Sequence, residues 1–366
     1  MSESFQTLGI PASSSTVTVK AFNLVNDPSK VSISASLFLT PVLPGHESLR
    51  CPAFAFLIEN AATKRRVMFD LGPRKDLENA APSLAEAFKA GALDMPMKRD
   101  IVEQLTDNGV DLKSISAVIW SHSHFDHTGD MSKFPSSTEL VFGQEMVRAT
   151  YVTDPSSTLL ESDLAGRNLV AVDFASSQLE FAGFKVHDFF GDGSLYLLDV
   201  PGHLPGHLCA LARVTPTSFL FLGGDACHHA GLFRPTDKLH KHFPCPGDLL
   251  AATRRSVSAA HFSPPGAAAG SEFDLTARTT PLLDVADNGY YTDPPTARTS
   301  IGKMGSFDAN KDVFVMLAHD ESLMSVVGPF PALLDAWQAK GWKELVTWAF
   351  LDEKNPAFRF NTKAKA

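Results

Sequence analysis

Cysteines and long apolar segments are scarce in this sequence. The four cysteines form no CxxC pair and no disulfide-like framework, and they lie at positions 51, 209, 227 and 245. No segment approaches the roughly 18 apolar residues that a membrane-spanning helix requires. The first residues, Met1–Gln6, lack the basic region and apolar stretch of a secretory signal. We therefore expect a protein of a reducing, cytoplasmic compartment.

Basic residues are also fewer than acidic residues. The chain has 32 Lys and Arg against 41 Asp and Glu, a net charge of -9. Nucleic acids and anionic membranes bind clustered Lys and Arg, so we expect neither as a partner. With 366 residues, 44% of them hydrophobic and 20% charged, the composition is that of a globular protein with a sizeable core. The expected partner is a small-molecule substrate, bound by a monomer or a homodimer.

Several common catalytic motifs are missing as well. The sequence contains no Gly-x-Ser-x-Gly elbow, no P-loop and no dinucleotide fingerprint. Cys227 lies close to a candidate site residue, Asp225, but a buried thiol with no catalytic role is the commoner case. We therefore expect chemistry without a serine or cysteine nucleophile.

Histidine and aspartate are concentrated where the apolar run Ile115–Trp120 ends. This run predicts a short buried strand. Because alternate side chains of an extended segment point the same way, His122 and His124 can bind one cation together. Asp126 and His127 are adjacent and must diverge, which suits a second cation. Imidazole and carboxylate are ligands of zinc and similar metals, so the segment predicts a metal site.

The His-x-His-x-Asp-His pattern of residues 122–127 resembles that of the metallo-β-lactamase superfamily of hydrolases. The resemblance implies a third histidine, a bridging aspartate and a last histidine, each after a strand. The loop Pro201–His207 reads Pro-Gly-His-Leu-Pro-Gly-His, which assigns the third ligand to His203. His207 is expected to support the loop, with metal binding as the alternative.

The other implied ligands also follow predicted strands. Asp225, after the apolar run Ser218–Leu222, takes the place of the bridging aspartate, and His319 takes that of the last histidine. Asp70 begins an Asp-Leu-Gly turn that matches a supporting aspartate beneath the metal site in the superfamily. An aspartate before a glycine turn is also common without such a role, so both interpretations stay open.

The resemblance implies an α/β fold, an αββα sandwich of two mixed sheets flanked by helices. We expect a flexible N-terminal segment at 1–15, a single domain over 16–352 and a C-terminal tail at 353–366. The sequence pattern predicts strands at 17–22, 31–39, 52–58, 66–72, 115–120, 139–142, 179–186, 195–200, 208–214, 218–222 and 312–318. It predicts helices at 84–89, 99–105 and 329–341, and a short helix from Gly143.

The segment 226–300 is too long for a simple crossing between sheets and is expected to be an insertion or lid. Its aromatic residues could line a substrate pocket or pack the insertion against the core. The candidates are Phe243, Phe262, Tyr290 and Tyr291.

Two histidines, His228 and His229, follow Asp225 closely. In acyl-homoserine lactonases of the superfamily, a tyrosine three residues after the bridging aspartate contacts the substrate. Here that place holds His228, which disfavours that particular substrate. We expect His228 or His229 to face the substrate, since an imidazole with a pKa of about 6.5 suits proton transfer.

The resemblance further implies two divalent cations, zinc first, with iron or manganese as alternatives. One would be held by His122, His124 and His203, the other by Asp126, His127 and His319, with Asp225 between them. Such cations, about 3.5–4 Å apart, can hold a bridging water and lower its pKa towards about 7. The hypothesis is that the resulting hydroxide opens a lactone or lactam, with Asp126 moving a proton.

Three alternatives stay open. Thioester hydrolysis, as in glyoxalase II or polyketide thioesterases, uses the same fold. Persulfide dioxygenases share these ligands but use one iron. A metal-free binding relative is the third alternative, which the complete ligand set disfavours.

Overall fold

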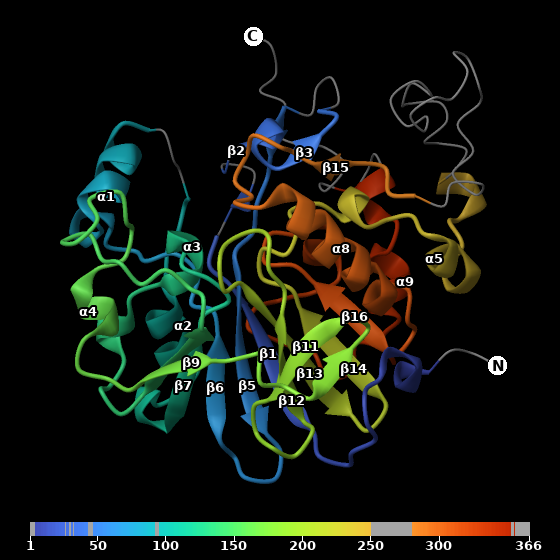
Figure 1. Cartoon of the computed structure of the whole chain (residues 1–366), viewed down its shortest axis with the longest axis horizontal. Helices are drawn as coiled ribbons and strands as arrows, with labels where there is room; N and C mark the ends of the chain where they lie inside the picture. Colours follow the sequence, from blue (N-terminus) through green and yellow to red (C-terminus); the bar gives the residue numbers. More distant parts are fainter. Residues whose placement is uncertain are drawn as a thin grey trace.

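Two β-sheets lie face to face at the centre of the molecule (Figure 1). The computed structural model describes residues 4–25, 27–28, 31, 33–42, 47–91, 95–249, 280–352 and 355. The seven-stranded sheet has the order β17 (Ala332–Leu333), β1 (Val17–Asn23), β5 (Phe54–Asn60), β6 (Arg66–Phe69), β7 (Ile115–Ile119), β8 (Glu139–Gly143) and β9 (Leu169–Val172). The six-stranded sheet has the order β10 (Leu179–Phe181), β11 (Phe184–Asp188), β12 (Leu195–Asp199), β13 (Leu208–Thr215), β14 (Ser218–Leu222) and β16 (Val313–Met316).

Smaller elements surround the two sheets. Two short ribbons pair β2 (Ile33–Ser34) with β4 (Ser48–Leu49) and β3 (Leu39–Thr40) with β15 (Asp284–Val285). The α-helices are α1 (Pro82–Lys89), α2 (Ile101–Asp107), α3 (Phe125–Thr128), α4 (Glu161–Leu164), α5 (Asp237–His242), α8 (Pro294–Asp308) and α9 (Trp342–Val346). The 3-10 turns are η1 (Phe5–Leu8), η3 (Ala35–Leu37), η4 (Leu77–Asn79), η5 (Leu112–Ser114), η6 (Met131–Lys133), η7 (Ala230–Leu232), η8 (Glu321–Ser325) and η9 (Ala349–Leu351). None of the helices among the described residues is long and apolar enough to cross a membrane.

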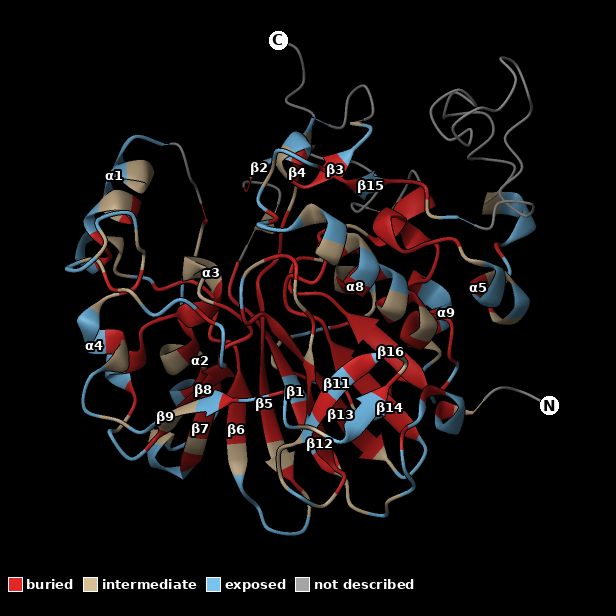
Figure 2. Cartoon of the chain, viewed as in Figure 1, coloured by how far each residue is buried: buried red, intermediate tan, exposed pale blue. Residues whose placement is uncertain are grey.

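The central strands are buried on both faces, as the red strands of Figure 2 show. Along β5, Phe56 and Ile58 join the core between the sheets, whereas the alternate residue Leu57 faces the outer layer. The outer layer includes α2 and α8, which pack through buried residues such as Leu105 and Phe307. Because both faces of these strands are covered, their sequences are nearly continuous apolar runs. This architecture confirms the predicted αββα sandwich.

The strand directions bring the predicted site loops to one edge. Strands β6 and β7 run parallel, and β14 runs parallel to β16. Strand β12 has the same direction as β14, because each is antiparallel to β13 between them. The carboxyl ends of these five strands lead to Asp70, His122, His203, Asp225 and His319.

The prediction of a C-terminal helix at 329–341 is wrong. Ala332 pairs with Ala21 to form the edge strand β17, and the next N–H, from Leu334, donates to the carbonyl of Val19. Pro329 and Pro331 supply no N–H for a helical ladder. A chain that bends after β17 still buries Leu334 and Trp337, so the apolar spacing resembled a helix face.

Other local predictions also differ from the structure. The segment 31–39 forms the two short strands β2 and β3 with η3 between them, and no helix begins at Gly143. Residues 4–12, expected to be flexible, pack on the second sheet: the N–H of Phe5 donates to Asp312 at 3.0 Å, and Arg213 donates to the carbonyl of Pro11. Two predicted segments lie wholly or largely outside the described residues. They are residues 250–279 of the predicted insertion, including Phe262, and the predicted tail except Asn355.

Candidate metal centre

The predicted ligand residues meet at one edge of the sandwich, although they come from loops far apart in the sequence. His122, His124, His203 and Asp225 form one group, and Asp126, His127 and His319 form another. Within each group, one potential ligand atom from each residue lies within 4.8 Å of all the others. The structure therefore brings together all seven residues that the sequence pattern singled out as ligands.

The first group has the dimensions of a four-ligand cage. His124 Nδ1 lies 3.0 Å from His122 Nε2 and 3.0 Å from His203 Nε2. Asp225 Oδ2 lies 3.6 Å and 3.4 Å from these two Nε2 atoms. Tetrahedral zinc with bonds of about 2.0–2.1 Å has its ligand atoms about 3.4 Å apart. The spacing of the four atoms fits such a cation.

The second group uses the other oxygen of Asp225. Asp225 Oδ1 lies 3.1 Å from His127 Nε2 and 3.2 Å from His319 Nε2. Asp126 Oδ2 lies 3.4 Å from His319 Nε2. The carboxylate of Asp225 therefore turns one oxygen to each group, which is the arrangement required of a bridging ligand.

The electrostatics of these groups favour a bound cation. Asp225 Oδ1 is buried and accepts no hydrogen bond from any residue that the structure describes. Burial opposes positive charge on His127 and His319, yet the carboxylate of Asp225 raises the pKa of both above the usual value. In the first group, burial lowers the pKa of His122 and His203 well below the usual range, so both present neutral nitrogen. The neutral imidazoles of His122 and His203, beside a buried carboxylate with one unpaired oxygen, fit a divalent metal.

Hydrogen bonds beneath the site fix the ligand histidines. Asp70 accepts the N–H of Ser121 at 2.7 Å, its hydroxyl at 2.8 Å and the Nδ1–H of His127 at 2.8 Å. Because the Ser121 hydroxyl donates to Asp70, its oxygen can accept from His122 Nδ1 at 2.9 Å. Both histidines are thereby left with an Nε2 lone pair facing the site. Asp70 thus lies where the resemblance requires its supporting aspartate.

Three more hydrogen bonds hold the remaining loops. His319 Nδ1 donates to the carbonyl of Pro52 at 2.7 Å. His207 Nδ1 donates to the carbonyl of Val200 at 3.0 Å, and its Nε2 accepts the backbone N–H of Asp225 at 3.1 Å. With both nitrogens engaged, His207 supports the loops and offers no free nitrogen to the candidate metal centre. Ser121 and Pro52 were missed by the sequence analysis, because a hydroxyl and a backbone carbonyl carry no distinctive spacing.

A cavity of about 290 Å³ opens onto the candidate metal centre. Its polar side presents His124, Asp126, His203, Asp225, His228 and His319. The rest of its lining is largely apolar and includes Ile33, Phe38, Cys51, Leu84, Ala87, Phe125 and Tyr290, together with Ser83, Ser156 and Thr158. Among the described residues, no lysine or arginine lines this cavity.

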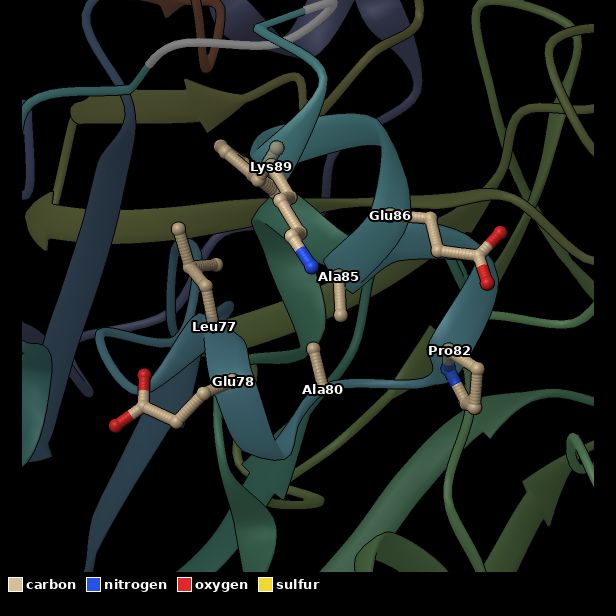
Figure 3. A pocket seen from close by; sticks show the side chains of 8 residues that line it. Leu77, Glu78, Ala80, Pro82, Ala85, Glu86 and Lys89 are labelled. Atoms are coloured by element: carbon tan, nitrogen blue, oxygen red, sulfur yellow. The ribbon is translucent and has the colours of Figure 1, made fainter.

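A larger hollow of about 560 Å³ lies beside α1 and η4 (Figure 3). Its described lining contains none of the predicted site residues and consists of Leu77, Glu78, Ala80, Pro82, Ala85, Glu86, Phe88 and Lys89. The carboxylates of Glu78 and Glu86 point away from one another, so they form no joint binding group. The smaller cavity, which is lined by five of the seven candidate ligands, is the candidate site.

His228 lies between the metal centre and the inserted segment. Its Nε2 is 3.1 Å from Asp225 Oδ2, its Nδ1 is 2.9 Å from the hydroxyl of Tyr291, and its ring stacks on Phe38 at 4.0 Å. Tyr290 stacks on the same phenylalanine at 5.5 Å and lines the cavity. Burial lowers the pKa of His228, which favours the neutral imidazole. Tyr291 is buried behind His228 and does not line the cavity.

Two predicted substrate contacts lie elsewhere. His229 accepts the N–H of Gly231 at 3.0 Å, which caps η7, and its ring packs against Phe350. Phe243 packs beneath the ammonium of Lys343, and its carbonyl accepts the indole N–H of Trp348 at 3.0 Å. The structure therefore corrects the prediction that these two residues line the substrate cavity, because the chain after His228 turns away into η7 and α5.

The two mixed sheets and the histidine and aspartate cluster at their edge define a metallo-hydrolase fold. The sequence model of the Metallo-beta-lactamase superfamily matches residues 49–226. The chain is 37% identical over 358 residues to Gamma-lactamase FDB1 of Fusarium pseudograminearum, covering 95% of this chain and 84% of that protein. It therefore belongs to the metallo-β-lactamase superfamily, which confirms the resemblance.

Two further comparisons agree. Metallo-hydrolase mfmC of Annulohypoxylon moriforme is 36% identical over 360 residues, covering 96% of this chain and 90% of that protein. A solved N-acyl homoserine lactone hydrolase, with N-hexanoyl-L-homoserine at its catalytic metal center, matches with a TM-score of 0.56. The match covers 87% of this chain and 99% of that chain at 17% identity, so it supports the fold alone.

Proposed function

We propose that this protein is a binuclear metal-dependent hydrolase that opens a small, neutral lactone or lactam. The observation that carries the proposal is the carboxylate of Asp225, whose two oxygens face two separate ligand groups at the polar side of a largely apolar cavity. The relative named as a gamma-lactamase supports the same reaction class. Zinc is the first candidate metal, with iron or manganese as alternatives, because the donors are imidazole and carboxylate without thiolate.

The two cations would supply water of lowered pKa and polarise the scissile carbonyl. The chain itself would orient the substrate: Phe38, Leu84 and Phe125 supply apolar lining beside the ligands. Asp126 lines the cavity and so can accept the proton of the attacking water and return it to the leaving oxygen or nitrogen. His228, at the same side, can donate its Nε2–H towards the substrate.

The cavity favours a compact, uncharged substrate. Its volume of about 290 Å³ is just below the range of about 300–1,000 Å³ for small-molecule sites. Thioesters of glutathione or coenzyme A carry carboxylates or phosphates, which bind arginine or lysine. The described lining offers neither, so lactone or lactam hydrolysis is better supported than thioester hydrolysis. A persulfide dioxygenase shares these ligands, so the number and identity of the bound metals distinguish it from the proposed hydrolase.

The experiment that tests the proposal combines metal analysis with a substrate panel. The purified chain is stripped with a chelator, reloaded separately with zinc, manganese or iron, and assayed on γ-lactones, γ-lactams and thioesters, including a glutathione thioester. We expect two metal equivalents per chain and metal-dependent ring opening. Faster hydrolysis of the thioesters, or one iron with persulfide oxidation, would overturn it.

A matched pair of variants tests the ligand assignment. His203→Ala removes a predicted ligand, whereas His187→Ala removes an exposed histidine of β11. We expect His203→Ala to lose ring-opening activity and His187→Ala to retain it. Full activity in His203→Ala would contradict the assigned site.

A further inference from the structure

Both ring nitrogens of His228 are engaged, and their partners define its tautomer. Nε2 lies 3.1 Å from Asp225 Oδ2, and a carboxylate oxygen can only accept. The hydrogen of a neutral His228 must therefore be on Nε2, which leaves a lone pair on Nδ1. The partner of Nδ1 is the hydroxyl of Tyr291 at 2.9 Å, so this hydroxyl donates.

Tyr291 is placed to control His228 without touching the substrate. It is 4% exposed, and its ring packs against His203 with the centroids 5.4 Å apart. On the cavity side, Phe38 stacks on the imidazole at 4.0 Å. Held by Phe38, Asp225 and Tyr291, the imidazole has a single well-supported orientation.

The backbone around Tyr291 is itself tied to the metal loop. The N–H and hydroxyl of Thr292 donate to the carbonyl of His203 at 3.0 and 3.1 Å, and the N–H of Asp293 donates to the carbonyl of Gly202 at 3.0 Å. These bonds fix the position from which the Tyr291 hydroxyl reaches His228. The segment 290–293 therefore lines the cavity through its first residue and supports the site through the other three.

We propose that Tyr291 is a positioning residue that holds His228 in the Nε2–H tautomer, so that this N–H donates to the substrate carbonyl oxygen as negative charge develops on it. The proposal rests on the hydrolase function proposed above. Without substrate, the N–H donates to Asp225; with substrate, it is shared with the carbonyl oxygen. The water oxygen bonds to the carbonyl carbon, the ring C–O or C–N bond breaks, and the water proton passes through Asp126 to the leaving atom. His228 transfers no proton.

Asp225 and Tyr291 hold this tautomer together, and loss of the Tyr291 hydroxyl removes the donor to Nδ1. In Tyr291→Phe, Asp225 alone favours hydrogen on Nε2, so the imidazole is held less firmly and the fraction with hydrogen on Nδ1 rises. Substitution of the partners that orient metal-binding histidines typically costs about 10–100-fold in activity, and we take the same magnitude for Tyr291. We expect the loss in kcat, with KM nearly unchanged, because the stabilised charge exists only in the transition state.

The decisive experiment compares Tyr291→Phe in two backgrounds. In the wild-type background we expect kcat to fall about 10–100-fold at unchanged metal content. His228→Gln keeps an N–H donor but has no tautomers, so adding Tyr291→Phe to it should cost less than threefold. Tyr196→Phe removes the hydroxyl of another buried tyrosine, on β12, and serves as the matched control with unchanged kcat. Equal losses in both backgrounds, or none in either, would overturn the proposal.

A spectroscopic measurement tests the tautomer without substrate. Nitrogen-15 NMR of histidine-labelled, zinc-loaded protein, with His228 assigned from His228→Gln, should show Nε2 protonated in the wild type and a mixture in Tyr291→Phe. Protonation of Nδ1 in the wild type would overturn the tautomer assignment. If no lactone or lactam is hydrolysed but the tautomer is as expected, the proposed function fails and the support of His228 by Tyr291 stands.

Discussion

Asp70→Asn should weaken the binding of the cation expected in the ligand group of His127, while leaving the fold intact. Asp70 Oδ1 accepts the N–H of Ser121, and Oδ2 accepts the Ser121 hydroxyl and the Nδ1–H of His127. An asparagine that keeps the first bond must turn its NH₂ towards the other two groups. That NH₂ would face the Nδ1–H of His127, so the ring must move its hydrogen to Nε2 and lose the lone pair that faces the metal centre.

The magnitude follows from the contacts that change. Replacing a hydrogen-bond partner of a metal-binding histidine typically costs about 10–100-fold in metal affinity, or about 1.4–2.7 kcal/mol. The backbone does not confound the test. Asp70 has a φ of 57°, a left-handed conformation in which asparagine is as well tolerated as aspartate.

The assay is a metal count after dialysis against chelators of increasing strength. We expect wild type to retain two cations per chain over a range in which Asp70→Asn retains one. The matched control is Asp111→Asn, since Asp111 is exposed and only caps η5 by accepting the N–H of Lys113 at 2.9 Å. If Asp70→Asn kept both cations with affinities within twofold of wild type, the reasoning about His127 would be refuted.

Three further predictions concern stability. Removing the metals with a chelator should lower the melting temperature, because a ligand at 100 times its Kd stabilises by about 2.7 kcal/mol; an unchanged melting temperature would contradict this. Gly202→Ala should cost about 1–3 kcal/mol in urea unfolding, because its Cβ would lie 2.4 Å from the backbone of Ala297 at a φ of +128°, whereas Gly302→Ala, with nothing within 4 Å, should not destabilise. Burial lowers the pKa of Lys343 to about 7. The unfolded state therefore binds more protons above pH 7, and stability should rise by up to about 1.4 kcal/mol per pH unit towards pH 10, relative to Lys343→Met at each pH; parallel profiles would refute this.

The sequence predicted the residues of the site better than the contacts that orient them. His122, Asp225 and His319 each follow an apolar run that becomes a buried strand, so their position at one edge could be expected from strand direction. The hydrogen bonds that orient these residues could not be predicted from the sequence. The carbonyl of Pro52 belongs to a different loop from His319, and only the folded chain brings them within 2.7 Å.

Residues that are adjacent in the sequence were also given the wrong roles where the chain changes direction. His228 and His229 are adjacent, but one lines the cavity and the other caps η7, because neighbouring side chains of an extended segment point apart. Spacing alone gave the two residues equal weight. The helix predicted at 329–341 failed for a related reason: buried residues with helical spacing, such as Leu334 and Trp337, can also be buried by a bent chain beside an edge strand.

The position of the metal centre at the seam between the sheets has a consequence for stability. His124 and His127 follow β7 of the seven-stranded sheet, whereas His203, Asp225 and His319 follow strands of the six-stranded sheet. Each ligand group contains members from both sheets. A cation in either group would therefore link the two sheets at the edge where the cavity opens. Metal loss should then loosen this edge first, while the apolar core between the sheets keeps the opposite edge closed.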